Sequence, residues 1–209
     1  TPVALDWFMA PFRLHLAPAE ETILYELSVH NGAAPRDGWK SNQKALRTLI
    51  ELTLVETPSQ ESLSLHPAIR SWLYQQLPPD RRSALHLAAA NLYAERSRFT
   101  LAAHHYIQAG QPSMAIWTWY NHRQQEINQG QSSAALELFL PLRQTQLTNV
   151  EDQRALALLF AQLCSPAGQT QEGLTALEQV AWPASSPSSA QAYQLRAELL
   201  TDVGEIDRA

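Results

Sequence analysis

The sequence has a single cysteine, Cys164, among its 209 residues. One cysteine excludes an intramolecular disulfide and a cysteine-rich zinc module. It is also typical of a reducing compartment, so we expect a cytoplasmic protein. The sequence has no run of about 18 consecutive apolar residues, so we expect no membrane-spanning helix and no membrane partner.

The first residues lack the features of a signal peptide, and position 1 is not methionine. Residues Thr1 to Phe12 contain no basic segment followed by an apolar one. We therefore expect a piece of a longer protein, with the possibility that the chemistry lies outside it. The proline-containing stretch Thr1 to Pro18 is interpreted as an arm that packs on a neighbouring element.

An excess of positive charge is also missing. Lys and Arg number 15 against 20 Asp and Glu, for a formal net charge of −5. This balance disfavours a strongly basic nucleic-acid binder. The apolar fraction of 45% and charged fraction of 17% favour a packed core over general disorder.

The first 78 residues predict a small helical domain with a β-ribbon. Helical spacing of apolar residues and helix-starting signals indicate three helices, and alternation indicates two strands. The expected elements are a helix over Ala19–His30, a break over 31–38, a helix from Ser41 as N-cap to Leu52, strands over Leu54–Thr57 and Ser62–His66, and a helix over Pro67–Leu77. This order is a winged-helix pattern, three helices with a two-stranded ribbon, and we assign it to a domain over residues 1–78.

Residues 79–209 predict helical repeats without strands. Small residues recur at Ala102, Ala135, Gly173 and Ala209, at intervals of 33, 38 and 36. A large residue follows four positions after the first three, and a glycine precedes the last three by five positions, at Gly130, Gly168 and Gly204. The spacing is close to that of the helix-turn-helix tetratricopeptide (TPR) repeat, so we expect a mainly α chain ending in an α-α superhelix of TPR-like repeats, truncated at its C-terminus. The stretch from Pro183 to Ser189 is interpreted as a loop between repeats.

Four segments carry a resemblance to a known family. Ala45–Glu56 and Leu63–Leu73 resemble the winged helix of signal-transduction ATPases with numerous domains (the STAND class). Leu92–Arg96 and Ala102–Gly110 are similar to the first helical units of the superhelix that follows it in that class. The class includes LuxR-type activators related to the maltose-regulon activator, and the NB-ARC switch proteins.

The resemblance implies an ATPase module upstream in the same chain, with ATP or ADP as its cofactor. This sequence holds no Walker A loop. The nearest segment, Gly32 to Ser41, has the wrong glycine spacing and follows a helix instead of a strand. The resemblance also implies that His66, at the end of the ribbon, senses the nucleotide phosphate in the parent protein. The alternative is a histidine that caps a helix start or packs at an interface.

A cluster of cations near the second expected helix raises DNA binding as a weaker alternative. The cluster consists of Arg36, Lys40, Lys44 and Arg47. Cations of this kind contact phosphates. However, residues 1–78 carry six Lys and Arg against eight Asp and Glu, and Glu61 lies at the tip of the ribbon. The same cations serve equally well as a solvated face.

The resemblance further implies a binding surface on the concave face of the repeats. In such repeats the first helix of each pair lines that face. The residues that it would place there are Asn91, Glu95, Trp117, Tyr120, Gln124, Asn128 and Gln162. An aromatic pair rimmed by amides suits a small-molecule or protein ligand. The alternative for Trp117 is packing against the next helix.

Motifs for catalysis or metal binding are missing. The seven histidines form no i,i+4 pair, and no Gly-x-Ser-x-Gly element is present. We therefore expect no metal site, no cofactor in this sequence and no catalytic activity. The predicted function is regulatory: relaying the state of the upstream ATPase and sensing an inducer or partner through the repeats. The alternatives are a free-standing TPR-like adaptor and a DNA-binding regulator.

Overall fold

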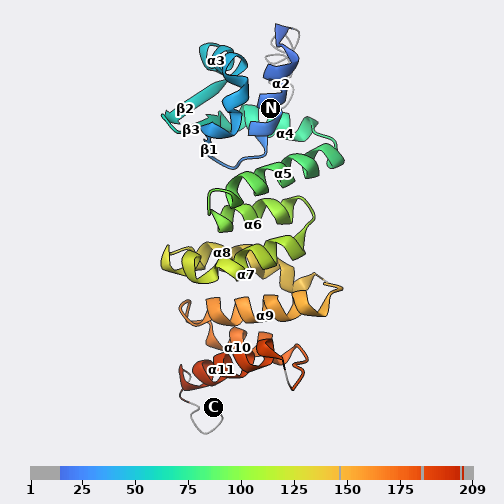
Figure 1. Cartoon of the computed structure of the whole chain (residues 1–209), viewed down its shortest axis with the longest axis vertical. Coiled ribbons are helices and arrows are strands. Elements are labelled where there is room, and N and C mark those ends of the chain that lie inside the picture. The colour runs from blue at the N-terminus through green and yellow to red at the C-terminus, as the bar shows by residue number, and fades with distance from the viewer. Residues whose placement is uncertain (1–14, 146, 185, 203, 205–209) are drawn as a thin grey trace. The chain divides into compact units, whose positions relative to one another are not determined.

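The chain is mainly helical with one small sheet (Figure 1). It divides into two compact units. The structure, a computed structural model, describes residues 15–145, 147–184, 186–202 and 204. The units separate between Leu92 and Tyr93, one helix later than the predicted boundary at residue 78. Most of the expected arm at Thr1–Pro18, and the repeat position Ala209, lie outside the described residues.

The first unit combines helices with a three-stranded sheet. Its elements are α2 (Pro18–Ser28), β1 (Ala34–Pro35), the 3-10 helix η1 (Arg36–Asn42), α3 (Gln43–Glu51), β2 (Val55–Ser59), β3 (Ser62–Leu65), α4 (Pro67–Gln76) and most of α5 (Pro79–Ala94). The antiparallel strand order is β1-β3-β2, with Ala34 opposite Leu63 and Val55 opposite Leu65. The two predicted ribbon strands and the helix that begins at Pro67 are present with ends shifted by one or two residues.

The segment predicted as a break is structured. Trp39 is buried in the kink of η1, and its indole N–H donates to Glu26 Oε2 on α2 at 2.6 Å. This contact holds η1 on α2. Ser41 lies inside η1, and Asn42, not Ser41, is the N-cap of α3. The pairing of β1 with β3 and the Trp39–Glu26 bond are tertiary contacts, which local sequence signals do not report.

The core of the first unit draws on every one of its longer elements. Ile23, Leu24 and Leu27 of α2 are buried against Leu46 and Leu49 of α3, as helical spacing predicts. Strand β3, α4 and α5 add further side chains, namely Leu63, Trp72, Leu73 and Ala89. The presence of Ala89 in this core explains why the first unit extends beyond residue 78.

The second unit is a series of antiparallel helices. They are α6 (Phe99–Gln108), α7 (Pro112–Asn128), α8 (Ser132–Phe139), the 3-10 helix η2 (Leu140–Gln144), α9 (Val150–Cys164), α10 (Thr170–Glu178) and α11 (Pro187–Asp202). Helix α9 (Figure 1) packs against α7, α8, α10 and α11. Its residues from Ala155 to Ala161 are all buried. Of the described helices, none combines the length and apolar character that crossing a bilayer requires.

Each turn inside a helix pair uses one left-handed residue. Ser97, Gly130 and Gly168 have φ values of 55°, 75° and 70°. In each turn the next residue's N–H donates to the carbonyl five positions back, with donor–acceptor distances of 2.9 to 3.0 Å; the pairs are Arg98 to Tyr93, Gln131 to Glu126 and Gln169 to Cys164. This bond closes a helix C-terminus in the Schellman motif. The predicted glycine register therefore coincides with a repeated turn geometry, in which Ser97 occupies the first position.

The small residues that define the register are buried, and one of them lies where two helices approach closely. Ala102 and Ala135 are fully buried. At Gly173 an added Cβ would lie 3.3 Å from the Ala161 Cα and 3.2 Å from the Cys164 Cβ. These distances explain why α9 and α10 approach closely only with a small residue at this position.

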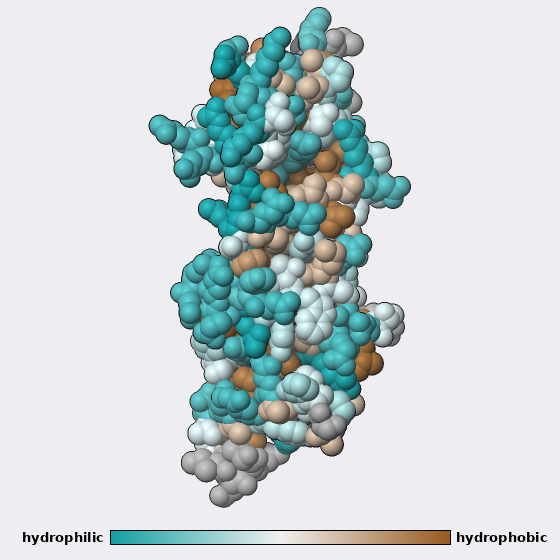
Figure 2. All heavy atoms as spheres, in the orientation of Figure 1, coloured by the Kyte–Doolittle hydropathy of each residue, from teal (hydrophilic) through white to brown (hydrophobic). Residues whose placement is uncertain are grey.

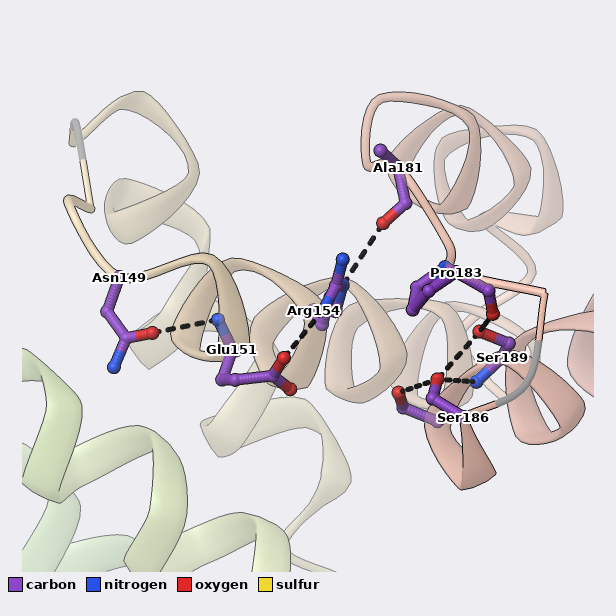
Figure 3. A network of polar contacts seen from close by, with 8 residues as sticks. Asn149, Glu151, Arg154, Ala181, Pro183, Ser186 and Ser189 are labelled. Atoms are coloured by element: carbon purple, nitrogen blue, oxygen red, sulfur yellow. Dashed lines mark hydrogen bonds and ion pairs between the residues drawn. The ribbon is translucent and has the colours of Figure 1, made fainter.

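A polar network fixes the connection from α10 to α11 (Figure 3). Asn149 Oδ1 accepts from the Glu151 N–H and caps α9, and Glu151 pairs with Arg154 at 2.5 Å. Arg154 then donates to the Ala181 carbonyl, and Ser189 Oγ donates to the Pro183 carbonyl. Because α10 ends at Glu178 and α11 begins at Pro187, the connection begins and ends earlier than the predicted loop over Pro183–Ser189.

The turn geometry predicts opposite effects at two equivalent positions. Replacing Gly130 by Ala places a Cβ on a left-handed residue and should lower the free energy of unfolding by about 1 kcal/mol. Ser97→Gly removes that strain and should raise it by about 0.5 kcal/mol, because the greater freedom of glycine in the unfolded chain offsets part of the gain. Urea titrations of both variants test this, and a gain for Gly130→Ala would contradict the assigned turn.

Burial of His30 predicts acid sensitivity in the first unit. Its ring is 3% exposed and contacts Trp39 edge to face at 5.9 Å between centroids. Burial lowers the pKa of His30 to about 4, and the nearby His86 adds to the shift. His30 and Trp39 line a small cavity, and Glu26 is the carboxylate among the residues that line it with them. Between pH 6.5 and 4 the unfolded chain binds a proton that the folded His30 does not, so stability falls as the pH is lowered.

We expect the lowered pKa of His30 to reduce the free energy of unfolding by about 2 kcal/mol when the pH falls from 8 to 5. Urea titrations at several pH values measure it. His30→Gln should flatten the dependence in this window, whereas the same change at the exposed His15 should not. Parallel profiles for wild type and His30→Gln would show that His30 does not carry the effect.

Candidate functional site

The first helices of successive pairs in the second unit form a common face. Helix α7 contacts α9, and α9 contacts α11. On α7, the residues Trp117, Tyr120, Gln124 and Asn128 have spacings of three and four, which place them along one side of the helix. Trp117 and Tyr120 lie nearer the N-terminal end of this side, and Gln124 and Asn128 lie nearer its C-terminal end.

A groove of about 240 Å³ lies toward the C-terminal ends of these helices. We call it the amide groove. Its lining comes from all three helices and the turn after α9, and comprises Gln124, Ile127, Ala161, Gln162, Ser165, Pro166, Leu195, Glu198 and Leu199. The structure thus brings together Gln124 and Gln162, which sequence analysis proposed from different repeats.

The polar groups of the amide groove are unequally satisfied. Gln124 Nε2 donates to Asn128 Oδ1 at 3.2 Å, which places Asn128 beside the groove. Glu198 accepts from Gln194 at 2.9 Å, and Ser165 Oγ donates to Asp202 at 3.0 Å. In contrast, Gln162 Oε1 is buried and has no hydrogen-bond partner among the described residues. A buried acceptor without a donor is costly, so this carbonyl favours a donor that enters the groove.

The aromatic pair at the other end of α7 holds helices together. The Trp117 indole N–H donates to Asp152 Oδ1 at 2.7 Å on α9, and Tyr120 O–H donates to Gln191 Oε1 at 2.7 Å on α11. The two rings meet edge to face at 5.5 Å, and the Arg123 guanidinium lies 4.3 Å over the Tyr120 ring. Trp117 therefore makes the contact with the next helix that the alternative interpretation expects, and a ligand role for the pair stays a prediction.

Two buried carboxylates in this unit have structural partners. Glu126 accepts from the backbone N–H of Thr100 at 2.9 Å and from its hydroxyl at 2.5 Å, at the N-terminus of α6. Trp119 donates to the same hydroxyl at 2.9 Å. Asp152 accepts from Ser113 and Trp117 in the first turn of α9. Helix N-termini stabilise negative charge, so both carboxylates are suited to joining helices.

The remaining concave candidates lie apart from the amide groove. Asn91 belongs to the first unit and Glu95 to the second, and both are exposed. Glu95 forms an ion pair with the adjacent Arg96 at 4.0 Å. Neither residue lines the groove.

His66 is exposed and caps α4. Its Nδ1 accepts from the Ala68 N–H at 3.3 Å, while Pro67 occupies the first helical position. This is the capping arrangement weighed as the alternative to nucleotide sensing. Since Nδ1 is the acceptor, Nε2 carries the proton and remains able to donate to a phosphate oxygen.

The cation cluster is distributed over η1 and α3. Arg36 is partly buried, and its backbone N–H donates to the Glu61 carbonyl at 2.8 Å. Lys40, Lys44 and Arg47 are exposed. The DNA-binding alternative stays a prediction, since solvated side chains of this kind are equally typical of a helix surface.

The second unit also contains a larger cavity that was not predicted from the sequence. It has a volume of about 490 Å³ and lies between η2, the connection that follows it, α9 and α10. We call it the Arg143 cavity, after the cation in its wall. Its residues come from three elements with no common periodicity, so sequence spacing carried no signal for it.

On the face drawn in Figure 2, hydrophilic side chains predominate, and hydrophobic side chains are exposed only in small areas.

The environment of the single cysteine disfavours reaction at its thiol. Cys164 is fully buried at the end of α9. Burial raises the pKa of its thiol to about 11, with a further contribution from Glu172 and a smaller opposing one from Arg143. The thiolate is the reactive form, so this environment disfavours nucleophilic chemistry. Within the described part of the chain, no three His, Cys, Asp or Glu side chains converge as metal ligands.

The chain matches no protein-family model, no curated protein and no solved structure.

Proposed function

We propose that this chain is a non-catalytic segment of a STAND-type signalling regulator, and that its helical pairs bind a protein partner or inducer in the amide groove. The first unit, as a winged helix, relays the nucleotide state of an ATPase module in the same protein. The order of helices and ribbon strands in residues 18–76 supports the winged-helix assignment. The recurrent left-handed turns at Ser97, Gly130 and Gly168 support the TPR-like assignment.

The observation that carries the binding proposal is the buried carbonyl of Gln162. Its Oε1 has no donor among the described residues, and Gln162 lines a groove to which three successive first helices contribute. A partner that supplies an N–H or O–H at this point satisfies the acceptor and gains a hydrogen bond. Peptide backbone and amide side chains present such donors. Ile127, Leu195 and Leu199 supply apolar contact beside them.

Peptide selection against the intact chain tests this proposal. Peptides displayed on phage are selected on the immobilised chain, and the affinity of each synthetic peptide is measured by fluorescence anisotropy. We expect Gln162→Met to weaken binding by about 3- to 10-fold, because it removes the acceptor while keeping the length of the side chain.

Gln171→Met is the matched control, since Gln171 is exposed on α10 and lies outside the groove. Its affinity for the peptides should equal that of the wild type. Equal binding by Gln162→Met, or a selection that yields no peptide, would contradict the proposal.

The relay part of the proposal has a separate test. An antibody to this sequence should detect a native gene product several times larger than the 23.4 kDa of these 209 residues, because the ATPase module must be carried in the same chain. An immunoblot of the source cells measures this size. A band near 23.4 kDa would reject the relay role and favour the free-standing adaptor, in which the groove still binds its partner.

A further inference from the structure

The Arg143 cavity has the size and chemistry of a small-molecule site. Its volume of about 490 Å³ lies within the range of protein ligand pockets, which is roughly 300–1,000 Å³. The apolar part of its wall comes from η2, α9, α10 and the residues just after α10, through Leu142, Leu156, Ala157, Phe160, Ala176 and Val180. Such a wall suits an apolar body of matching size.

A single cation is set into this wall. Arg143 is partly buried, and its guanidinium lies 4.6 Å over the ring centre of Phe160. One terminal nitrogen donates to Gln179 Oε1 at 3.2 Å. Among the described residues, no carboxylate forms an ion pair with Arg143, and no Asp or Glu lines the cavity. Within the described part of the chain, the positive charge therefore has no carboxylate at ion-pair distance.

The other polar groups of the wall are neutral. Gln153 is occupied, since its Nε2 donates to the Leu147 carbonyl at 2.6 Å. Thr145 and Thr148 supply hydroxyls, and Gln179 holds Arg143. An arginine has five N–H donors in a planar fork that matches a carboxylate, and the bond to Gln179 uses one of them. The stacking on Phe160 orients this fork in advance.

We propose that the Arg143 cavity binds a small organic acid, with an apolar body against Leu156, Ala157 and Phe160 and a carboxylate on Arg143. Charge-assisted hydrogen bonds to a partly buried guanidinium are stronger than neutral ones, so the carboxylate supplies specificity and the body supplies burial. The cavity shares no residue with the amide groove. This inference therefore stands independently of the proposed function.

The occupant would also connect two helical pairs. Helix α8 forms a pair with α7 and is followed by η2, whereas α9 and α10 form the next pair. The cavity is lined by η2 and by both helices of this next pair. A ligand that binds only the folded arrangement raises stability in proportion to its occupancy. Binding should therefore raise the melting temperature of the chain.

Octanoate and 1-octanol provide the test on the intact chain, because they share an apolar body and differ in the carboxylate. Binding is measured by isothermal titration calorimetry, and melting by circular dichroism. We expect octanoate to bind at least 10-fold more tightly than 1-octanol and to raise the melting temperature. Arg143→Gln should weaken octanoate binding by about 10- to 100-fold and leave 1-octanol unchanged.

Two further variants complete the design. Ala157→Leu fills part of the cavity and should weaken both compounds. Arg98→Gln makes the same charge change at an exposed residue that does not line the cavity, and both affinities should remain those of the wild type. The proposal is overturned if the wild type binds octanoate no better than 1-octanol, or if Arg143→Gln retains the octanoate affinity. The wild-type comparison decides the question even where a variant fails to fold.

Discussion

The left-handed turn that closes each helical pair is the constraint on which the second unit depends. A residue with positive φ ends the first helix and directs the chain back, so that the second helix runs antiparallel to it. Five residues later a small residue is buried, at Ala102, Ala135 and Gly173, and Gly173 lies where α9 approaches α10 closely. The turn fixes the direction of the second helix and the small residue fixes its distance. Together they determine where side chains of successive pairs meet.

Polar side chains in the second unit divide into those that join helices and those that face a cavity. Glu126 and Asp152 are buried, but each accepts several hydrogen bonds at a helix N-terminus. Trp117, Trp119 and Tyr120 donate their polar hydrogens to neighbouring elements. The Gln162 carbonyl and the Arg143 charge remain with unused capacity. Binding capacity therefore lies where structural pairing is incomplete.

Helix α9 is shared by both cavities. Its Ala161 and Gln162 line the amide groove, whereas Ala157 and Phe160, about one turn earlier, line the Arg143 cavity. Because α9 packs on α7, α8, α10 and α11, its residues are buried on nearly every side. An occupant of either cavity therefore contacts the central packing element of the unit. Ligand binding and helix packing draw on the same side chains.

The sequence by itself determined the mainly helical class, the β-ribbon with Pro67 starting the next helix, and the register of the turns. These features depend on local rules of apolar spacing, proline geometry and positive φ. Only the tertiary structure decided the folding of residues 34–42, where Trp39 bonds to Glu26, and the partners of Trp117 and Tyr120. It also decided that Gln124 and Gln162 share a groove and that Arg143 lacks a carboxylate partner in the described chain, because such pairings join residues without a common local period.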